Sequence, residues 1–226
     1  MLTKLEQALG YVYQDKTLLR TALSHTSYAN EVHKDALRSY ERLEFLGDAI
    51  LGFATAEYLY HTFPTKQEGE LTKIRAELVC EKNLAEIAHQ IHLGDYLLLG
   101  NGEEQGGGRN RASILCDVIE ALIAAAFIDG GTVAAQGIVT RLVIPNLTKV
   151  LNTHDFKTEL QEIVQRKRDQ ALTYELIGEQ GPDHCKQFSV RVLLNGAEVG
   201  RGVGTSKKRA EQAAAEQAIQ KLSKSG

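Results

Sequence analysis

The stretch that decides the fold is Glu-Arg-Leu-Glu-Phe-Leu-Gly-Asp, residues 41–48. On an α-helix, where successive side chains lie about 100° apart, Glu41, Glu44 and Asp48 fall within about 60° of one another. Three carboxylates on one helical face repel each other, so helix stability alone does not favour this arrangement. A divalent cation removes the repulsion, and the octapeptide therefore predicts a helix that carries metal ligands.

A second acidic pair lies further along the chain. Asp117 and Glu120 fall inside the apolar run 113–128, and buried carboxylates need a compensating partner. A single acidic pair is usually a solvated helix face, so the interpretation depends on both clusters together. Two helices that each offer an acidic pair, with oxygen ligands only, indicate a site for a hard cation such as Mg²⁺ or Mn²⁺.

Three segments of the chain resemble bacterial ribonuclease III. They are the octapeptide, Ser-His-Thr-Ser-Tyr-Ala-Asn-Glu at residues 24–31, and Ser-Ile-Leu-Cys-Asp-Val-Ile-Glu-Ala-Leu at residues 113–122. The C-terminal part resembles a double-stranded-RNA-binding domain, so the resemblance extends over nearly the whole chain. It implies a Mg²⁺-dependent endoribonuclease, in which Mn²⁺ can substitute, that cleaves double-stranded RNA to 5′-phosphate and 3′-hydroxyl ends. The family's substrates imply a role in rRNA and mRNA processing.

The net charge of −3 argues at first against a nucleic-acid partner. However, residues 153–226 hold 12 Lys and Arg against 10 Asp and Glu, whereas residues 1–152 hold 14 against 19. The acidic excess of the first part fits a metal site, and the second part is locally basic at residues 207–209. Because a phosphate group responds to the local patch, the global charge does not exclude RNA.

Composition and targeting signals favour a cytoplasmic protein. The longest apolar stretch, residues 118–128, is too short to span a membrane, and the first residues lack the apolar region of a signal peptide. Cys80, Cys116 and Cys185 are widely spaced and match neither a disulfide framework nor a zinc site. We therefore expect a cytoplasmic location, no membrane partner and no small-molecule cofactor.

Length and periodicity predict two domains, residues 1–151 and 152–226. The first is expected to be all-α, and the resemblance makes it the catalytic and dimerisation domain. Its longer helices are predicted at about residues 35–60, 70–91, 112–128 and 133–151, and the Gly-rich residues 100–108 are expected to form a flexible loop.

The second domain is predicted to be a small α+β unit of order α-β-β-β-α, with a three-stranded antiparallel sheet and two helices on one face. Apolar side chains recur at every second position from Phe188 to Leu194, which is the period of a strand. Asn195-Gly196 is a strong hairpin-turn signal. This order of elements is that of a double-stranded-RNA-binding domain.

The resemblance assigns the metal ligands to four carboxylates, Glu44, Asp48, Asp117 and Glu120. Phosphodiester hydrolysis needs an activated water and stabilisation of charge on the leaving 3′ oxygen, and carboxylate-held Mg²⁺ ions supply both. Asp48 and Glu120 are therefore expected to be catalytic residues as well as ligands.

Glu41 and Glu68 are further catalytic candidates, because the resemblance places both in the catalytic valley outside the principal ligand set. For Glu68, a charge at a helix N-terminus explains the residue equally well. His25, between Ser24 and Thr26, is expected to belong to a structural helix end and not to act as a base.

Phe45 has two interpretations. A phenylalanine in an apolar context is usually a core residue, but the resemblance places this position at a two-fold interface where the octapeptide helices of two subunits meet. It implies a homodimer with two acidic clusters along one valley, and a C₂ dimer is the commonest symmetry of soluble oligomers.

Candidate RNA contacts lie in the second domain. Gln161 and Gln165 are one helical turn apart, and amide side chains suit the 2′-hydroxyls and base edges of the shallow RNA minor groove. His184 lies in an expected turn that could enter the next minor groove. Lys207 and Lys208 open the last helix, where free backbone N–H groups add to the lysine charges for phosphate binding.

Two positions depart from the family pattern. Tyr40 stands where Asn is common, and Cys116 stands where Ala usually precedes the aspartate. Neither change removes a ligand, but an exposed Cys116 would make the site sensitive to oxidation.

The alternative function is a catalytically silent regulator that binds double-stranded RNA and uses the first domain only as a dimerisation scaffold. Loss of a ligand carboxylate would favour this alternative, and none is lost. A phosphohydrolase of small nucleotides is disfavoured, because a nucleotide cannot span two minor grooves.

Overall fold

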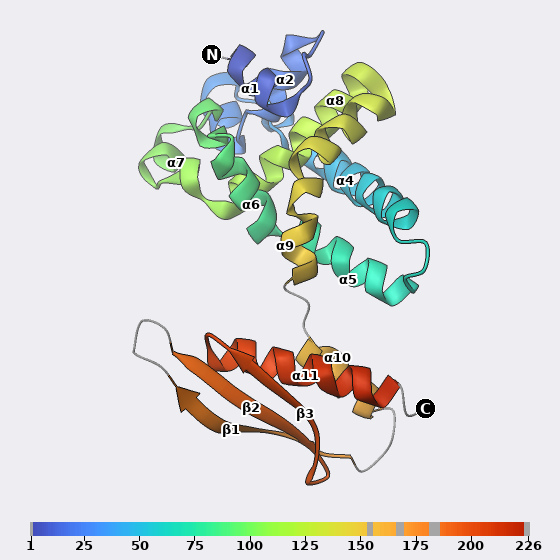
Figure 1. Ribbon diagram of the computed structural model, residues 1–226. Helices are drawn as coiled ribbons and strands as arrows, with labels where there is room; N and C mark the ends of the chain where they lie inside the picture. Colours follow the sequence, from blue (N-terminus) through green and yellow to red (C-terminus); the bar gives the residue numbers. More distant parts are fainter. Residues whose placement is uncertain (1, 153–155, 166–169, 181–185, 224–226) are drawn as a thin grey trace. The chain divides into compact units, whose positions relative to one another are not determined.

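The structure is a computed structural model that describes residues 2–152, 156–165, 170–180 and 186–223 (Figure 1). The chain divides into two compact units, Met1–Asn152 and Thr153–Gly226. Each unit has a hydrophobic core of its own. Among the described residues, none of the helices combines the length and apolar character needed to cross a membrane.

The described part of the first unit is built from α-helices joined by short 3₁₀ and π turns, as predicted. The helices are α1 (Leu2–Leu9), α2 (Lys16–Ala22), α3 (Thr26–Tyr28), α4 (Glu41–Thr62), α5 (Glu68–Val79), α6 (Glu81–Gln90), α7 (Asn101–Gln105), α8 (Ala112–Leu142) and α9 (Leu147–Asn152).

Helices α4 and α8 pack against each other in the centre of this unit. Helix α4 buries residues that recur every three or four positions, the spacing of one helical face: Leu43, Gly47, Leu51, Ala54, Thr55 and Leu59. Helix α8 is apolar on nearly all sides from Ile114 to Ala126, because other helices surround it. At Gly47 the backbones come so close that an added Cβ would lie 2.0 Å from the carbonyl oxygen of Glu120.

Several expected helix limits were wrong. Helix α4 begins at Glu41 and not near residue 35, because Asp35 instead caps a 3₁₀ turn, Ala36–Arg38, and Ser39 is extended. The helix expected over residues 70–91 is two helices, since Cys80 between α5 and α6 has extended backbone angles.

The Gly-rich segment and the helices that follow it also differ from expectation. Residues 100–108, expected as a flexible loop, contain α7 and the start of a 3₁₀ turn, Gly108–Asn110. Helix α8 continues to Leu142 through a kink at Gly131, whose φ of 73° is readily adopted by glycine alone.

The second unit has the predicted order α-β-β-β-α. Its elements are α10 (Phe156–Gln165), β1 (Leu172–Gln180), β2 (Gln187–Leu194), β3 (Ala197–Gly204) and α11 (Lys207–Ser223). The strands form an antiparallel sheet of order β1-β2-β3, and both helices cover one face of it (Figure 1). This confirms the predicted fold class, an all-α domain followed by a small α+β domain.

Two sequence signals explain the local geometry of the sheet. Asn195 and Gly196 both have positive φ, 51° and 83°, as the tight turn between β2 and β3 requires. On β3, a Cβ at Gly202 would lie 2.2 Å from the backbone nitrogen of Ala214, so this glycine permits α11 to lie directly on the sheet.

Two glycines of α4 test the close approach of α4 and α8. We expect Gly47→Ala to lower the free energy of unfolding of the first unit by about 1–3 kcal/mol, because the new methyl group would overlap the backbone of α8. Gly52→Ala is the matched control: nothing lies within 4 Å of its Cβ position, so better helix propensity should raise the free energy by about 0.5–1 kcal/mol. Denaturant unfolding measures both changes, and equal effects of the two variants would contradict the contact.

Candidate metal centre and nucleic-acid surface

The structure brings four predicted carboxylates together where α4 crosses α8. Glu44 and Asp48 lie on α4, and Asp117 and Glu120 lie on α8. Each pair is three or four residues apart, so both members share one helical face. Glycine at position 47 permits the close approach, since any side chain there would push the two helices apart. The cluster is therefore a direct consequence of how the two helices pack.

Burial and mutual repulsion make this cluster electrostatically unfavourable. Glu120 is only 8% exposed, and burial raises its pKa to about 8, with the charges of Asp48, Glu44 and Asp117 adding to the effect. Burial also raises the pKa of Glu44, and so do the neighbouring charges of Asp117 and Asp48. The pKa of Asp117 is raised by burial as well. All three groups resist ionisation unless a cation is present.

The donor set fits a hard divalent cation. Among the described residues, no hydrogen-bond donor reaches the Glu120 side chain, which is 8% exposed and keeps some access to solvent. A carboxylate in such surroundings needs a compensating partner. The four groups supply oxygen atoms only, which suits Mg²⁺ or Mn²⁺. A cation at this position would neutralise the repulsion and satisfy the buried carboxylate together.

Two further side chains orient the acidic residues, and the sequence analysis did not identify their role. The hydroxyl of Tyr40 donates to Oδ2 of Asp117 at 3.2 Å, and this bond lowers the pKa of Asp117 against the larger effect of burial. The hydroxyl of Thr26 donates to Oε1 of Glu41 at 2.7 Å. Tyr40, one of the two departures from the family pattern, is therefore a buried partner of the cluster.

Cys116 lies directly beside the cluster. Its Sγ and the carboxylate oxygens of Asp117 and Glu120 lie within 4.8 Å of one another. Burial first, and then the nearby carboxylates, raise the pKa of this thiol to about 12. Sensitivity to oxidation was expected only for an exposed Cys116. Because the thiol is buried and protonated, this expectation does not apply.

His25 is a structural residue, as expected. Its Nδ1 accepts the backbone N–H of Ser27 at 3.1 Å, and this bond caps the short helix α3. Its ring lies 5.7 Å from the ring of Tyr40. It therefore supports the residue that holds Asp117.

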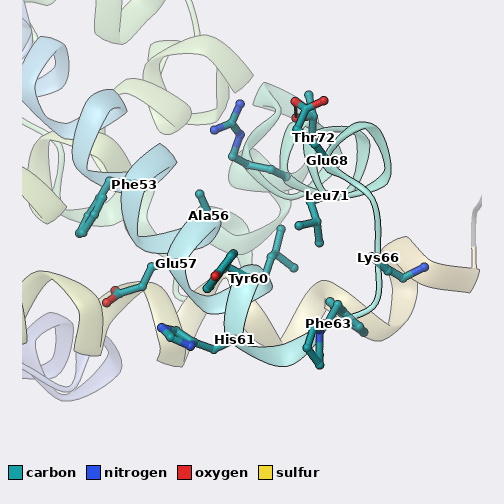
Figure 2. Close-up of a pocket in the computed structure, with 13 residues that line it drawn as sticks. Phe53, Ala56, Glu57, Tyr60, His61, Phe63, Lys66, Glu68, Leu71 and Thr72 are labelled. Carbon is teal, nitrogen blue, oxygen red and sulfur yellow. Dashed lines mark hydrogen bonds between the residues drawn. The ribbon is translucent and has the colours of Figure 1, made fainter.

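Glu68 does not join the other acidic residues within the chain. It lies at the start of α5, where it accepts a hydrogen bond from Thr72 at 2.9 Å. It also lines a cavity of about 880 Å³ between α4 and α5. Figure 2 shows it beside Thr72, with Phe53 and Tyr60 of α4 in the same cavity wall. Phe45, on α4, is 81% exposed and is not a core residue.

The predicted RNA contacts in the second unit lie on its surface. Gln161 and Gln165 are exposed on α10, and Lys207 and Lys208 are exposed in the first turn of α11. His184 lies outside the described residues.

A lysine and a tyrosine, which the sequence analysis did not single out, lie beside the two glutamines. The Lys157 ammonium lies 4.6 Å from the ring centre of Tyr174, and both residues line a small cavity together with Gln161 and Gln165. Lys157 also forms an ion pair with Glu211, which holds α10 against α11. No local sequence pattern signals these contacts, because their members are far apart in the chain.

Comparison with known proteins gives matches over both units. A family model described as Ribonuclease-III-like matches residues 15–147, and a model of the double-stranded RNA binding motif matches residues 156–222. The chain is 44% identical over 221 residues to Ribonuclease 3 of Listeria welshimeri, covering 97% of this chain and 96% of that protein. It is 48% identical over 225 residues to Ribonuclease 3 of Caldanaerobacter subterraneus, covering 98% of both.

A solved structure is also similar to the first unit. The nuclease domain of ribonuclease III from Campylobacter jejuni matches with a TM-score of 0.60 and 44% identity, covering 65% of this chain and 98% of that one. In that nuclease domain, structural flexibility occurs in a region involved in dimer formation.

The raised pKa of Glu120 predicts that metal affinity depends on pH. Because a cation must displace the proton, the affinity for Mn²⁺ should fall by up to about tenfold for each pH unit below about 8, and should level off above it. Calorimetric titration of the full chain with Mn²⁺ at a series of pH values measures this dependence.

The same group predicts a change in stability without metal. The pKa of Glu120 is higher in the folded chain than in the unfolded chain, so its protonation stabilises the folded state. This stabilisation is fully present below the ordinary glutamate pKa and is lost as the pH rises through about 8. Glu120→Gln should remove the part of both pH dependences that is centred near pH 8, whereas Glu44 and Asp117 still titrate. An affinity that stays constant down to about pH 6 would contradict a Glu120 carboxylate whose pKa is raised to about 8.

Proposed function

The chain belongs to the ribonuclease III family, and we propose that it hydrolyses double-stranded RNA to 5′-phosphate and 3′-hydroxyl ends with a divalent metal ion. The observation that carries this proposal is the buried Glu120 side chain, which has no hydrogen-bond donor among the described residues and faces three further carboxylates. A scaffold that served only for dimerisation would have no reason to keep this unfavourable cluster. From the family we also infer processing of ribosomal and messenger RNA in the cytoplasm.

The metal would be held by Glu44, Asp48, Asp117 and Glu120, with Mg²⁺ as the expected ion and Mn²⁺ as a substitute. When bound, such an ion lowers the pKa of its bound water and offsets charge on the leaving 3′ oxygen. The chain itself orients the ligands: Tyr40 holds Asp117 through its hydroxyl, and close packing at Gly47 fixes α4 against α8.

Two more acidic residues have a role at the edge of this site in our proposal. Glu41 is exposed at the start of α4 and is held by Thr26, so it can orient water or substrate without desolvation. Glu68 lies in the cavity between α4 and α5 and would act only where another subunit closes that cavity.

We assign duplex binding to the second unit. Gln161 and Gln165 would contact 2′-hydroxyls in one minor groove, His184 the next groove, and Lys207 and Lys208 the intervening phosphates. The lysine ammonium groups stand at the N-terminus of a 17-residue helix, where the dipole and free N–H groups also attract anions. Recognition of this kind reads the shape of the duplex and little of its sequence.

The apolar face of α4 supports a homodimer. Phe45, Phe53 and Tyr60 are all largely exposed, and their spacing places them on one side of the helix. Exposed aromatic side chains that lie together usually mark an interface. Phe45 would pack against the partner subunit near the octapeptide, which brings two acidic clusters into one valley.

A pair of variants separates chemistry from binding. Glu120→Gln removes one charged ligand, so single-turnover cleavage of labelled duplex RNA in low Mg²⁺ should slow by at least about a hundredfold. Duplex affinity should stay within about threefold, because the contacts of the second unit are untouched. Glu77→Gln, an exposed carboxylate on α5, is the matched control and should cleave normally.

The complementary variant replaces Lys207 and Lys208 with Ala. Affinity for every duplex should fall, and the slope of log affinity against log salt should flatten by up to about two phosphate contacts. Cleavage in low salt should persist, because the carboxylates remain. Near-normal cleavage by Glu120→Gln would refute the proposed catalytic site, and unchanged duplex affinity of the lysine variant would refute the proposed anchor.

A further inference from the structure

A second polar cavity lies in the first unit, away from the four carboxylates. It has a volume of about 340 Å³ and is formed by α2, α3, the turns that follow α3, and Leu98. Its lining includes Arg20, Arg38 and His33, and it includes neither aspartate nor glutamate. In a chain with a net charge of −3, two arginines at one cavity without a lining carboxylate call for a separate explanation.

The two arginines are available to a ligand. Among the described residues, no carboxylate pairs with Arg20, and Arg38 makes a single ion pair with Asp35 at the long distance of 3.5 Å. The side chain of Arg38 is 65% exposed. Guanidinium groups bind phosphate through paired N–H donors, so two of them at one cavity mark it for a phosphate.

The arginines of the cavity offer hydrogen-bond donors, whereas its hydroxyl groups offer acceptors. Thr17 donates its hydrogen to Asp15, Thr21 donates to the carbonyl of Thr17, and Ser24 donates to the carbonyl of Arg20. Their donors are therefore used within the protein, and their oxygens remain as acceptors. Acceptor groups suit a ligand that carries hydroxyl donors of its own.

The remaining wall is apolar and aromatic. The Tyr28 ring packs edge-on against the His33 ring, with 5.8 Å between their centres, and Leu98 also lines the cavity. A planar base or a sugar face can pack on such a surface. The volume is also within the range of small-ligand pockets.

From these three features we infer that the cavity binds a phosphorylated ribose. This group repeats along every RNA strand and is also part of each free ribonucleotide. Arg20 and Arg38 hold the phosphate, and the threonine and serine oxygens accept the ribose hydroxyls. This goes beyond the proposed function, since none of these residues belongs to the metal centre or to the second unit.

The cavity is connected to the metal centre through one of its lining residues, Ser24. The carbonyl of Ser24 accepts the backbone N–H of Tyr40 at 2.9 Å, and the Tyr40 hydroxyl binds Asp117. In the same segment Thr26 binds Glu41. A ligand in the cavity therefore lies on a segment that also orients two of the acidic residues.

The test uses the full chain in a chelator, so that no metal links phosphate to the carboxylates. Calorimetry with adenosine 5′-monophosphate should show binding that Arg20→Gln/Arg38→Gln weakens at least about tenfold. Lys4→Gln/Lys82→Gln removes the same charge from exposed positions elsewhere in the first unit and should change the affinity by less than about twofold. Arg38→Gln alone, at an exposed side chain, keeps the test valid if the double variant does not fold.

Two further probes test ribose recognition. The 2′-deoxy nucleotide and inorganic phosphate should each bind more weakly than the ribonucleotide. Equal affinity for all three probes, or equal effects of the arginine and lysine variants, would overturn the inference.

A competition experiment then identifies the source of the ligand. If the ribose phosphate belongs to an RNA strand, the arginine variant loses affinity for duplex RNA and the mononucleotide competes with the duplex. If a free nucleotide is the ligand, duplex affinity is unchanged and the nucleotide binds alongside it. Either result supports the site, whereas a mononucleotide that does not bind the unaltered chain contradicts it.

Discussion

The contact between Gly47 and the backbone of Glu120 is the constraint on which the first unit depends. Because position 47 has no side chain, α4 and α8 approach closely enough to bring their acidic faces together. The same approach buries Glu120, so the fold itself creates the repulsion that a cation relieves. Burying a charge without a partner is costly, and in our proposal a bound metal ion offsets that cost.

Much of this arrangement could be predicted from sequence, because it follows from local periodicity. The three- and four-residue spacing of acids in the octapeptide determines one helical face, and alternation from Phe188 to Leu194 determines a strand. The break at Cys80 could not be predicted in this way. Asn83 donates to the carbonyl of Leu78, and its own oxygen accepts from Asn146, so a contact distant in sequence stabilises the end of α5.

Other parts of the site depend on tertiary contacts that no short pattern contains. Tyr40 and Asp117 are 77 positions apart, and the tyrosine shows its role only when α8 lies beside it. Glu68 likewise lies at the start of α5 and lines a cavity with residues of α4, which no short pattern indicates. Family resemblance supplied candidate residues, but the bonds that orient them had to come from the structure.

The most direct test of the account is the position of a bound ion. Crystals of the full chain grown with Mn²⁺ should show an anomalous peak at about 2.0–2.4 Å from carboxylate oxygens of both α4 and α8, with Glu120 among the ligands. That result would show that the buried carboxylate is satisfied by a cation. A peak on α4 alone, or no peak in the cluster at saturating Mn²⁺, would contradict the account.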